Sequence, residues 1–219
     1  MGLHTVYVTH DAAAIIGDRF GYHFLCKSPD WNVHCFRPAE KIEWIARLDG
    51  FSGRACFNPF GDPTPTGGPT VFMKHSNECG IPGSVYIAGP TPKCVVIGAD
   101  KIVVAPQVAD FLTRLYDIPN CGKVPIYRSF DNGRGRKYSS KKAFSPFDQG
   151  KDLRSGLQIE IKTLSAEKIP FNAKDFASPK GFKRIAQLTS VVYSPTQKET
   201  VKDTLDNMGF SSPLGRQKK

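Results

Sequence analysis

The chain has 219 residues, of which 40% are hydrophobic and 23% charged, so it can bury a core and is not disordered throughout. Its 17 prolines and 20 glycines favour turns and short strands over a helical bundle. It holds no run of about 18 apolar residues, so we expect no membrane span, and its formal net charge of +10 favours a polyanionic partner.

The positive charge is confined to the second half of the chain. Residues 1–100 contain 8 lysines and arginines and 9 acidic residues. The remaining 119 residues contain 22 lysines and arginines and 11 acidic residues. We therefore predict a neutral α+β region at 1–122 that docks on partner proteins and a basic α+β region at 123–210, in the same domain or a separate one. Residues 211–219 are predicted to form a disordered basic tail.

The N-terminal third is predicted to alternate strands and helices. Thr5–Thr9 is rich in β-branched residues and predicts a strand, and Ala12–Ile16 predicts a short helix. Phe20–Leu25 alternates aromatic residues and is expected to pair with Val33–Phe36. Pro38 predicts the start of a helix over Ala39–Leu48.

The middle of the chain is predicted to be rich in strands. Residues 58–69 hold four prolines and three glycines, which predicts a long exposed loop. Strands are expected at Thr70–Lys74, Ser84–Ala88 and Lys93–Ile97. The turn at 98–100 predicts that the last of these forms a hairpin with Ile102–Ala105, and Val108–Tyr116 is amphipathic, which predicts a helix.

The basic half adds further strands and helices. We predict strands at Lys123–Phe130, Lys137–Phe144, Leu157–Lys162 and Thr189–Tyr193, and helices at Phe182–Leu188 and Ser194–Met208. The turn signal at 131–133 predicts that the first two strands form a basic β-hairpin. The predicted fold class is therefore α+β, a strand-rich mixed fold with several short helices and a basic β-hairpin in the C-terminal half.

This hairpin is the strongest candidate for a nucleic-acid contact. Between Lys123 and Lys142 there are seven basic residues and one acid. Glycines allow backbone amides to approach a phosphate, arginines bind its oxygens in pairs, and a tyrosine can stack on a base. The candidate residues are Lys123, Arg128, Arg134, Gly135, Arg136, Lys137, Tyr138, Lys141 and Lys142. The alternative is a hairpin that is charged only for solubility.

A second basic cluster lies downstream. Lys180, Lys183 and Arg184 surround Phe182, which gives three cations beside one ring. The chain contains no RNP1 string, KH-type GXXG loop or zinc knuckle, so the sequence gives no basis for sequence-specific reading of RNA.

The cysteines allow a metal site but do not require one. Cys56, His75, Cys79 and Cys94 supply ligand types that zinc accepts, yet no Cys-x2-Cys pair occurs, so we expect no cofactor and treat zinc as the alternative. The six cysteines are widely spaced and Met1–Val6 does not resemble a secretory signal. Both observations predict thiols in the cytoplasm or another reducing compartment.

The sequence thus predicts a non-enzymatic RNA-binding subunit of a larger ribonucleoprotein assembly, with RNA favoured over DNA. One alternative is a small nuclease or phosphoesterase that uses a histidine, for which the dipeptide His10-Asp11 is the best candidate. Another is a structural interaction protein whose basic surface meets an acidic partner or an anionic lipid. The salt dependence of binding shows whether the ligand is held through phosphate contacts, because affinity that depends on phosphate neutralisation falls steeply as the salt concentration rises.

A five-residue variant tests the basic hairpin. Replacing Arg134, Arg136, Lys137, Lys141 and Lys142 with alanine is expected to weaken nucleic-acid binding by orders of magnitude, because each lost cation leaves a phosphate unneutralised. The free energy of unfolding should stay nearly constant, since exposed charges contribute little to stability. Filter binding and chemical denaturation measure the two quantities, and an unchanged affinity would remove the hairpin from the interface.

Overall fold

Two β-sheets form the framework of the protein. The structure is a computed structural model that describes residues 3–17, 21–57, 70–77, 80–88, 94–131 and 157–193. Sheet A has the strand order β1-β2-β3-β4-β5-β11, with strands at His4–Val8, Ala12–Gly17, Tyr22–Lys27, Asn32–Arg37, Ile42–Arg47 and Lys183–Arg184. Sheet B has the order β10-β9-β8-β7-β6, and in chain order its strands are Thr70–Ser76, Gly83–Ala88, Cys94–Ala99, Pro125–Asp131 and Leu157–Lys162.

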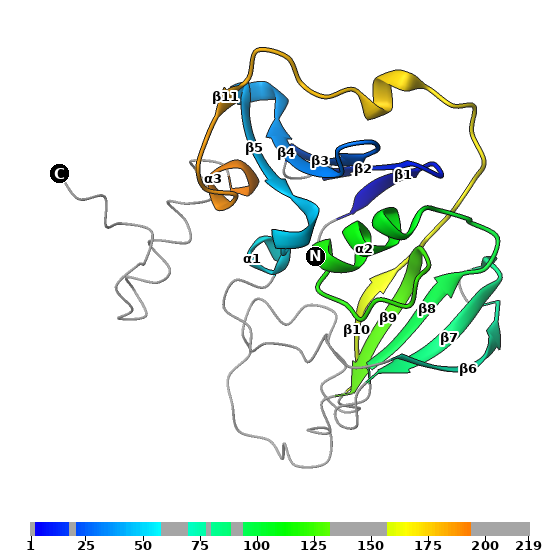
Figure 1. Ribbon diagram of the computed structural model, residues 1–219. Coiled ribbons are helices and arrows are strands. Elements are labelled where there is room, and N and C mark those ends of the chain that lie inside the picture. The colour runs from blue at the N-terminus through cyan, green and yellow to red at the C-terminus, as the bar shows by residue number, and fades with distance from the viewer. Residues whose placement is uncertain are drawn as a thin grey trace, which may run out of the picture.

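The helices are short. They are α1 at Arg54–Phe57, α2 at Pro106–Leu115 and α3 at Thr189–Val192, with single 3₁₀ turns at Pro38–Glu40, Leu48–Gly50 and Ala173–Phe176. Helix α2 contacts β2 and β3 of sheet A and β9 of sheet B, so it lies between the two sheets (Figure 1). Within the described ranges, no helix has the length and apolarity needed to cross a membrane.

One hydrophobic core joins the sheets. Alternate residues of β3 and β4 point inward, among them Phe24 and Val33, and both are fully buried. They belong to the same cluster of buried side chains as Phe111 of α2 and as Ile97 and Ile126 of sheet B. Residues from both halves of the chain therefore build this core.

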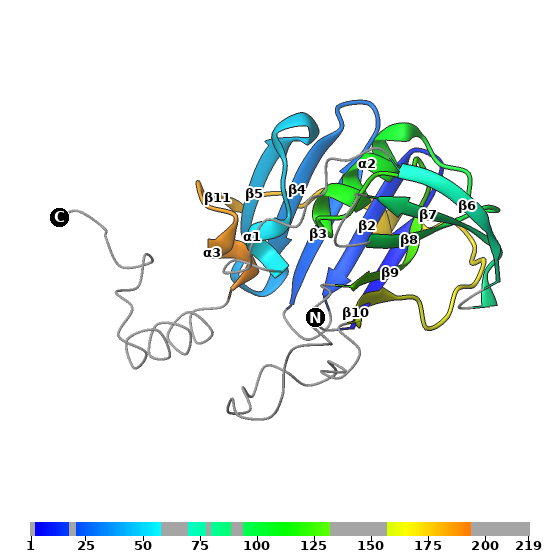
Figure 2. The same cartoon turned by 90° about the horizontal axis from the view of Figure 1, so that it is seen from below.

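The opposite, outer face of sheet A is also apolar, and a segment from near the C-terminus covers it. Phe176 packs there against Ala12, Ala14 and Leu25. The Nζ of Lys27 donates a hydrogen bond to the carbonyl oxygen of Phe176 at 3.0 Å. Further along the chain, β11 lies beside β5, and α3 contacts β4 and β5 (Figure 2, orange).

The α+β prediction is confirmed, and most predicted strands are present. The strand predicted at Leu157–Lys162 has the predicted bounds. The ends shift slightly at the strands predicted for Thr5–Thr9, Phe20–Leu25, Val33–Phe36, Thr70–Lys74, Ser84–Ala88, Lys93–Ile97 and Lys123–Phe130. Phe20–Leu25 and Val33–Phe36 also pair as expected, as β3 and β4. The helix predicted at Val108–Tyr116 is α2, and Pro106 occupies its first turn.

The helix predicted at Ala12–Ile16 is wrong, because these residues form β2. The strand pairs with β1 on one side and β3 on the other, so its backbone groups are bonded within the sheet. Its alanines are small enough for Phe176 to lie on the outer face. Helix propensity of alanine is a weak local preference, and tertiary packing overrides it here.

The helix predicted at Ala39–Leu48 is wrong as well. Pro38 begins only a single 3₁₀ turn, which ends at Lys41 with a left-handed φ of 49°. The chain then enters β5, which pairs with β4 along its whole length. Trp44 packs against the core between the sheets, so the apolar residues here follow a strand pattern.

Three further predictions fail for related reasons. Ile102–Ala105 joins no sheet and instead leads into α2, with the backbone N–H of Ala105 bonded to the carbonyl of His10. The helix predicted at Phe182–Leu188 contains strand β11, and the strand predicted at Thr189–Tyr193 contains helix α3. Both of these elements depend on contacts with β4 and β5, which are remote in sequence.

Several predicted segments lie outside the described residues. They are the loop 58–69, the hairpin strand Lys137–Phe144, the helix Ser194–Met208 and the tail 211–219. Strand β9 has β8 on one side and β10 on the other, and Asp131 is the Cα partner of Leu157. Both sides of β9 are therefore occupied, so the predicted pairing of Lys123–Phe130 with Lys137–Phe144 is wrong. The neighbour of β9 that follows it in the chain is β10, and the basic segment 132–156 joins these two strands.

Gly53 is a position where the fold leaves no room for a side chain. Its backbone N–H donates to the carbonyl of Arg114 at 3.0 Å, and a Cβ atom would overlap the backbone of Leu115. Gly53→Ala is expected to lower the free energy of unfolding by about 1–3 kcal/mol through overpacking. Gly50→Ala is the matched control, because no atom lies within 4 Å of its Cβ position. Equal urea midpoints for the two variants would contradict this close approach.

Candidate nucleic-acid interface

Four exposed cations gather where β5 meets β11. They are Lys41, Lys180, Lys183 and Arg184, and we call this group the basic edge. The backbone N–H of Lys183 donates to the carbonyl of Lys41 at 2.8 Å, which brings the two segments together. Among the described residues, none of the four forms an ion pair with an acid. The sequence identified three of them and missed Lys41.

Two chain reversals position these cations. The first is the 3₁₀ turn that ends at Lys41, and the second is the turn at Gly181, whose φ of 70° is readily adopted only by glycine. After Gly181 the chain pairs parallel with β5, so that Lys183 lies beside Ile42 and Arg184 beside Glu43. The basic edge is thus built on hydrogen-bonded backbone.

Positive charge extends from the basic edge onto the outer face of sheet A. Burial lowers the pKa of His34, and the nearby charges of Lys27 and Arg184 lower it further, while Glu43 opposes them. The carboxylate of Glu43 lies 3.9 Å from His34 Nδ1, too far for a hydrogen bond, and its side chain is mostly buried. Of the charges around His34, Glu43 has the largest effect, so on this face it offsets the nearby cations.

Aromatic rings lie next to these charges. Phe182 contacts Phe36 edge to face with 6.0 Å between ring centroids, and His23 lies 5.2 Å from Phe36. All three side chains are partly exposed. Rings beside cations are the combination that proteins use to bind single-stranded nucleic acid.

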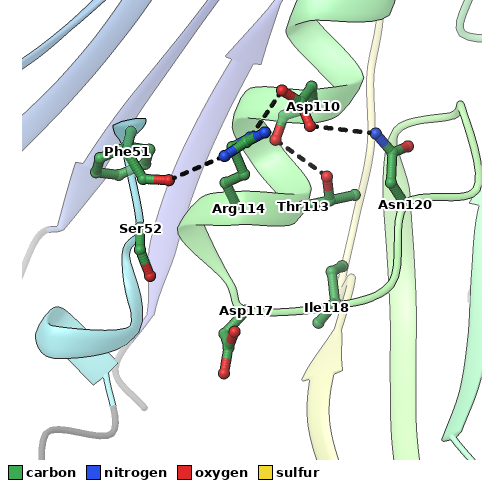
Figure 3. A pocket seen from close by; sticks show the side chains of 8 residues that line it. All are labelled: Phe51, Ser52, Asp110, Thr113, Arg114, Asp117, Ile118 and Asn120. Carbon is green, nitrogen blue, oxygen red and sulfur yellow. Dashed lines mark hydrogen bonds and ion pairs between the residues drawn. The ribbon is translucent and has the colours of Figure 1, made fainter. Parts of the chain in front are cut away.

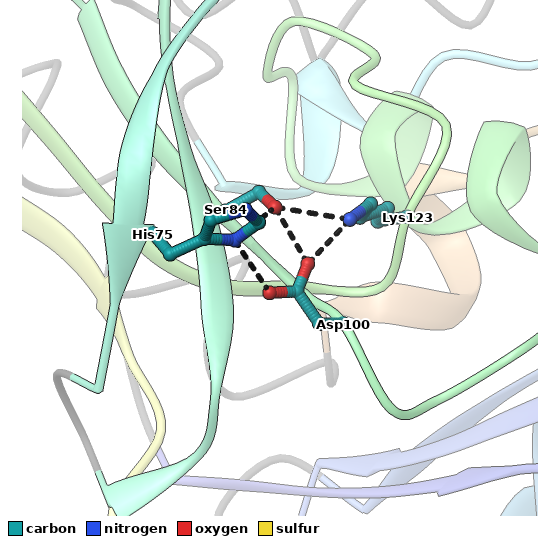
Figure 4. Close-up of polar contacts among 4 residues, drawn as sticks. All are labelled: His75, Ser84, Asp100 and Lys123. Carbon is teal, nitrogen blue, oxygen red and sulfur yellow. Dashed lines mark hydrogen bonds and ion pairs between the residues drawn. The ribbon is translucent and has the colours of Figure 1, made fainter.

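Lys123, by contrast, lies in a polar cluster of sheet B (Figure 4). Its Nζ donates to a carboxylate oxygen of Asp100 and to Ser84 Oγ, the latter at 3.1 Å. Ser84 Oγ donates to the same carboxylate at 2.6 Å, and His75 Nδ1 lies 3.1 Å from its second oxygen. The charge of Lys123 is therefore balanced within the protein.

This cluster has the residue types of a hydrolase site but not the geometry. His75 uses one nitrogen, Nδ1, toward both Asp100 and Ser84, whereas a catalytic triad requires two. The hydrogen bond to Asp100 raises the pKa of Lys123, so the amine stays protonated and cannot act as a base. We interpret the cluster as structural, because it ties β6, β7 and the ends of β8 and β9 together.

Arg128 is also engaged internally. Its side chain is buried and forms an ion pair with Glu160 of β10. A buried guanidinium that is paired with a carboxylate does not present its donors to a phosphate. We therefore leave Arg128 and Lys123 out of the proposed contact surface. The remaining hairpin candidates, Arg134, Gly135, Arg136, Lys137, Tyr138, Lys141 and Lys142, lie outside the described residues.

The candidate zinc ligands lie in different places. Cys56 belongs to the core between the sheets, Cys94 to a separate cluster with Val96, and His75 is exposed on β6. Burial raises the pKa of Cys56 to about 12, which disfavours the thiolate that binds metal. Cys79 lies outside the described residues, and within the described ones no group of three or more metal-ligating side chains occurs.

Two further features carry polar groups but lack the geometry of a catalytic site. His10 Nδ1 lies 2.7 Å from the carboxylate of Asp11, but both side chains are exposed in the turn between β1 and β2. A pocket of about 300 Å³ lies beside α2, and in its wall Arg114 donates to Asp110 and to the carbonyl of Phe51 (Figure 3). Arg114 and Asp110 thus bond each other within the wall, and among the described lining residues the hydrogen bonds in Figure 3 pair no nucleophile with a base.

No family model, curated protein or solved structure matches this chain.

The polar cluster predicts a pH-dependent contribution to stability. Hydrogen bonds from Lys123, Ser84 and His75 lower the pKa of Asp100 from 3.8 to about 2. The carboxylate therefore stabilises the fold fully above about pH 4, and this contribution is lost as the pH falls toward 2. Asp100→Asn should lower the free energy of unfolding at pH 7, and the difference from the wild type should shrink below pH 4.

Urea denaturation at several pH values measures this difference. Asp30→Asn is the control, because Asp30 is exposed in the turn between β3 and β4. A gap between the wild type and Asp100→Asn that stays constant down to pH 2 would contradict the assignment.

Proposed function

We propose that the protein binds single-stranded RNA without cleaving it, and that the basic edge contacts the backbone phosphates. The observation that carries this proposal is the group of four exposed cations, without acidic ion-pair partners among the described residues, beside the rings of Phe36 and Phe182. Cations on a surface release counterions when they neutralise phosphates, which supplies affinity for any sequence.

The ring contacts favour a single strand over a duplex. Reading the major groove of DNA requires an exposed helix or ribbon that carries polar residues. In the described part of the chain, α2 is the only helix longer than one turn, and most of its residues are buried between the sheets. An unpaired strand, in contrast, can place bases against partly exposed rings such as Phe182 and phosphates against Lys183 and Arg184.

The basic segment 132–156 provides a second source of contacts in this proposal. Its sequence contains Arg134, Arg136 and Lys137, and it joins sheet B at Asp131 and Leu157. The basic edge belongs to sheet A. Two separate basic regions are suited to a long flexible ligand, since each added phosphate contact increases affinity and salt dependence.

A pair of matched double variants tests the basic edge. Lys183→Ala/Arg184→Ala is expected to weaken binding to a labelled single-stranded RNA at least roughly tenfold, because a hydrogen bond to a charged group is worth about 1.5 kcal/mol or more. The slope of log affinity against log salt should fall by about 0.7 for each lost phosphate contact. Fluorescence anisotropy over a salt series measures both quantities.

The control variant is Lys101→Ala/Lys162→Ala, which removes the same charge from exposed positions at sheet B. It should keep nearly wild-type affinity. Equal losses in both variants would show that net charge alone attracts the RNA, and no loss in either would remove the basic edge from the interface. Tighter binding to a duplex of the same sequence would overturn the single-strand assignment.

A further inference from the structure

An exposed extended segment links the two sheets. Residues 164–171 follow β10 and are exposed throughout; we call them the strap. Its large apolar side chains, Leu164, Ile169 and Phe171, are between 48% and 73% exposed. In the described part of the chain, no backbone–backbone hydrogen bond involves these eight residues. Ordered backbone of this kind, with exposed apolar side chains, is suited to binding by another chain.

Both ends of the strap are fixed. At one end the N–H of Thr163 donates to the carbonyl of Ile126 at 2.9 Å, which continues the contact of β10 with β9. At the other end Asn172 caps the 3₁₀ turn that buries Phe176 on sheet A. Figure 1 shows this segment, in yellow, as it passes from sheet B to sheet A. The strap is therefore held in an extended form in the free protein.

A second apolar surface lies on the far edge of sheet B. Among the described strands, β6 pairs only with β7, so within that part of the chain no strand lies beside its outer backbone groups. Val71, Phe72 and Met73 of this strand are between 49% and 59% exposed. Soluble proteins usually protect an edge of this composition from pairing with other chains.

The strap begins at the edge of sheet B opposite to β6. Strands β10 and β6 are the opposite edges of sheet B, with β9, β8 and β7 between them. At about 4.8 Å per strand this separates the edges by roughly 19 Å, and the strap is anchored at the β10 side and on sheet A. Each copy therefore offers both an extended segment and a strand edge.

We propose that the strap of one copy binds the β6 edge of a second copy. Charge supports this choice of occupant, because the strap carries the exposed Glu167 and β6 the exposed Lys74. The strap also carries Lys168, but in a paired strand its side chain would lie on the opposite face from that of Glu167. In an antiparallel arrangement, Ile169 beside Phe72 brings Glu167 toward Lys74. Pro170 lacks an N–H group. In an edge strand the N–H groups of alternate residues point away from the neighbouring strand, so proline is tolerated at such a position.

The contact is limited in size. A bulge between Phe72 and Lys74 interrupts the regular pairing of β6 and shortens the run available to a new strand. The apolar side chains thus contribute more than a long ladder of hydrogen bonds. A small contact of this kind produces concentration-dependent association, either as a closed dimer with two reciprocal contacts or as a chain of copies.

Molar mass in solution tests the proposal. The wild type should increase in mass between micromolar and millimolar concentration in sedimentation or light-scattering measurements. The strap variant Ile169→Ser and the edge variant Phe72→Ser remove the two side chains that this arrangement places side by side, and each should remain monomeric. The control Leu3→Ser/Val103→Ser removes equally exposed apolar side chains elsewhere and should associate like the wild type.

Mixing the variants distinguishes a specific contact from nonspecific association of exposed apolar side chains. The strap variant keeps an intact edge and the edge variant an intact strap, so an equimolar mixture should form a heterodimer with one contact. Glu167→Lys should weaken association, and adding Lys74→Glu should restore it. Circular dichroism confirms that each variant is folded. A wild type that stays monomeric at millimolar concentration, or a mixture that forms no heterodimer, overturns the proposal. The binding partner of the strap would then be a different protein.

Discussion

The outer face of sheet A is the surface on which the arrangement of the C-terminal region depends. It is apolar around Ala12, Ala14 and Leu25, and the chain covers it with Phe176 from far along the sequence. Burying one such ring is worth about 1.5–3 kcal/mol, enough to define the path of the chain. To reach this face the backbone must leave β10 of sheet B and cross to sheet A, which creates the strap. It must then turn at Gly181 to finish as β11, which creates the basic edge.

A buried arginine fixes the other end of this path. Arg37 of β4 donates two hydrogen bonds to the carbonyl of Val191, at 3.0 and 2.7 Å, and one to that of Val192 at 2.9 Å. The last carbonyls of a helix have no partners within it, so the guanidinium satisfies groups of α3 that would otherwise be buried without bonds. Phe176 and Arg37 thus hold the segment that carries Lys183 and Arg184 on both sides. A site held in this way loses little conformational entropy when a ligand binds.

The sequence predicts the parts of this fold that local patterns determine. The alternation in Leu157–Lys162 correctly predicted a strand, and the amphipathic pattern of α2 correctly predicted a helix. The alanines of β2 suggested a helix, because nothing near them in sequence indicates that Phe176 packs on them. The candidate nucleic-acid interface likewise depends on contacts that local sequence patterns do not show. A count of charges along the chain cannot reveal that Arg128 is paired with Glu160, or that Lys41 lies beside Lys183. Both facts arise from contacts between distant segments.

The strap and the basic edge belong to one stretch of chain, yet they are anchored separately. The strap lies before Phe176 in the chain and the basic edge after it. Copies joined by strap and β6 would present their basic edges at a regular spacing. A single RNA strand that contacts several such edges gains affinity through effective concentration, without new contacts in any one copy. Self-association would then strengthen RNA binding, and RNA would in turn favour self-association, since coupling between two binding equilibria is reciprocal.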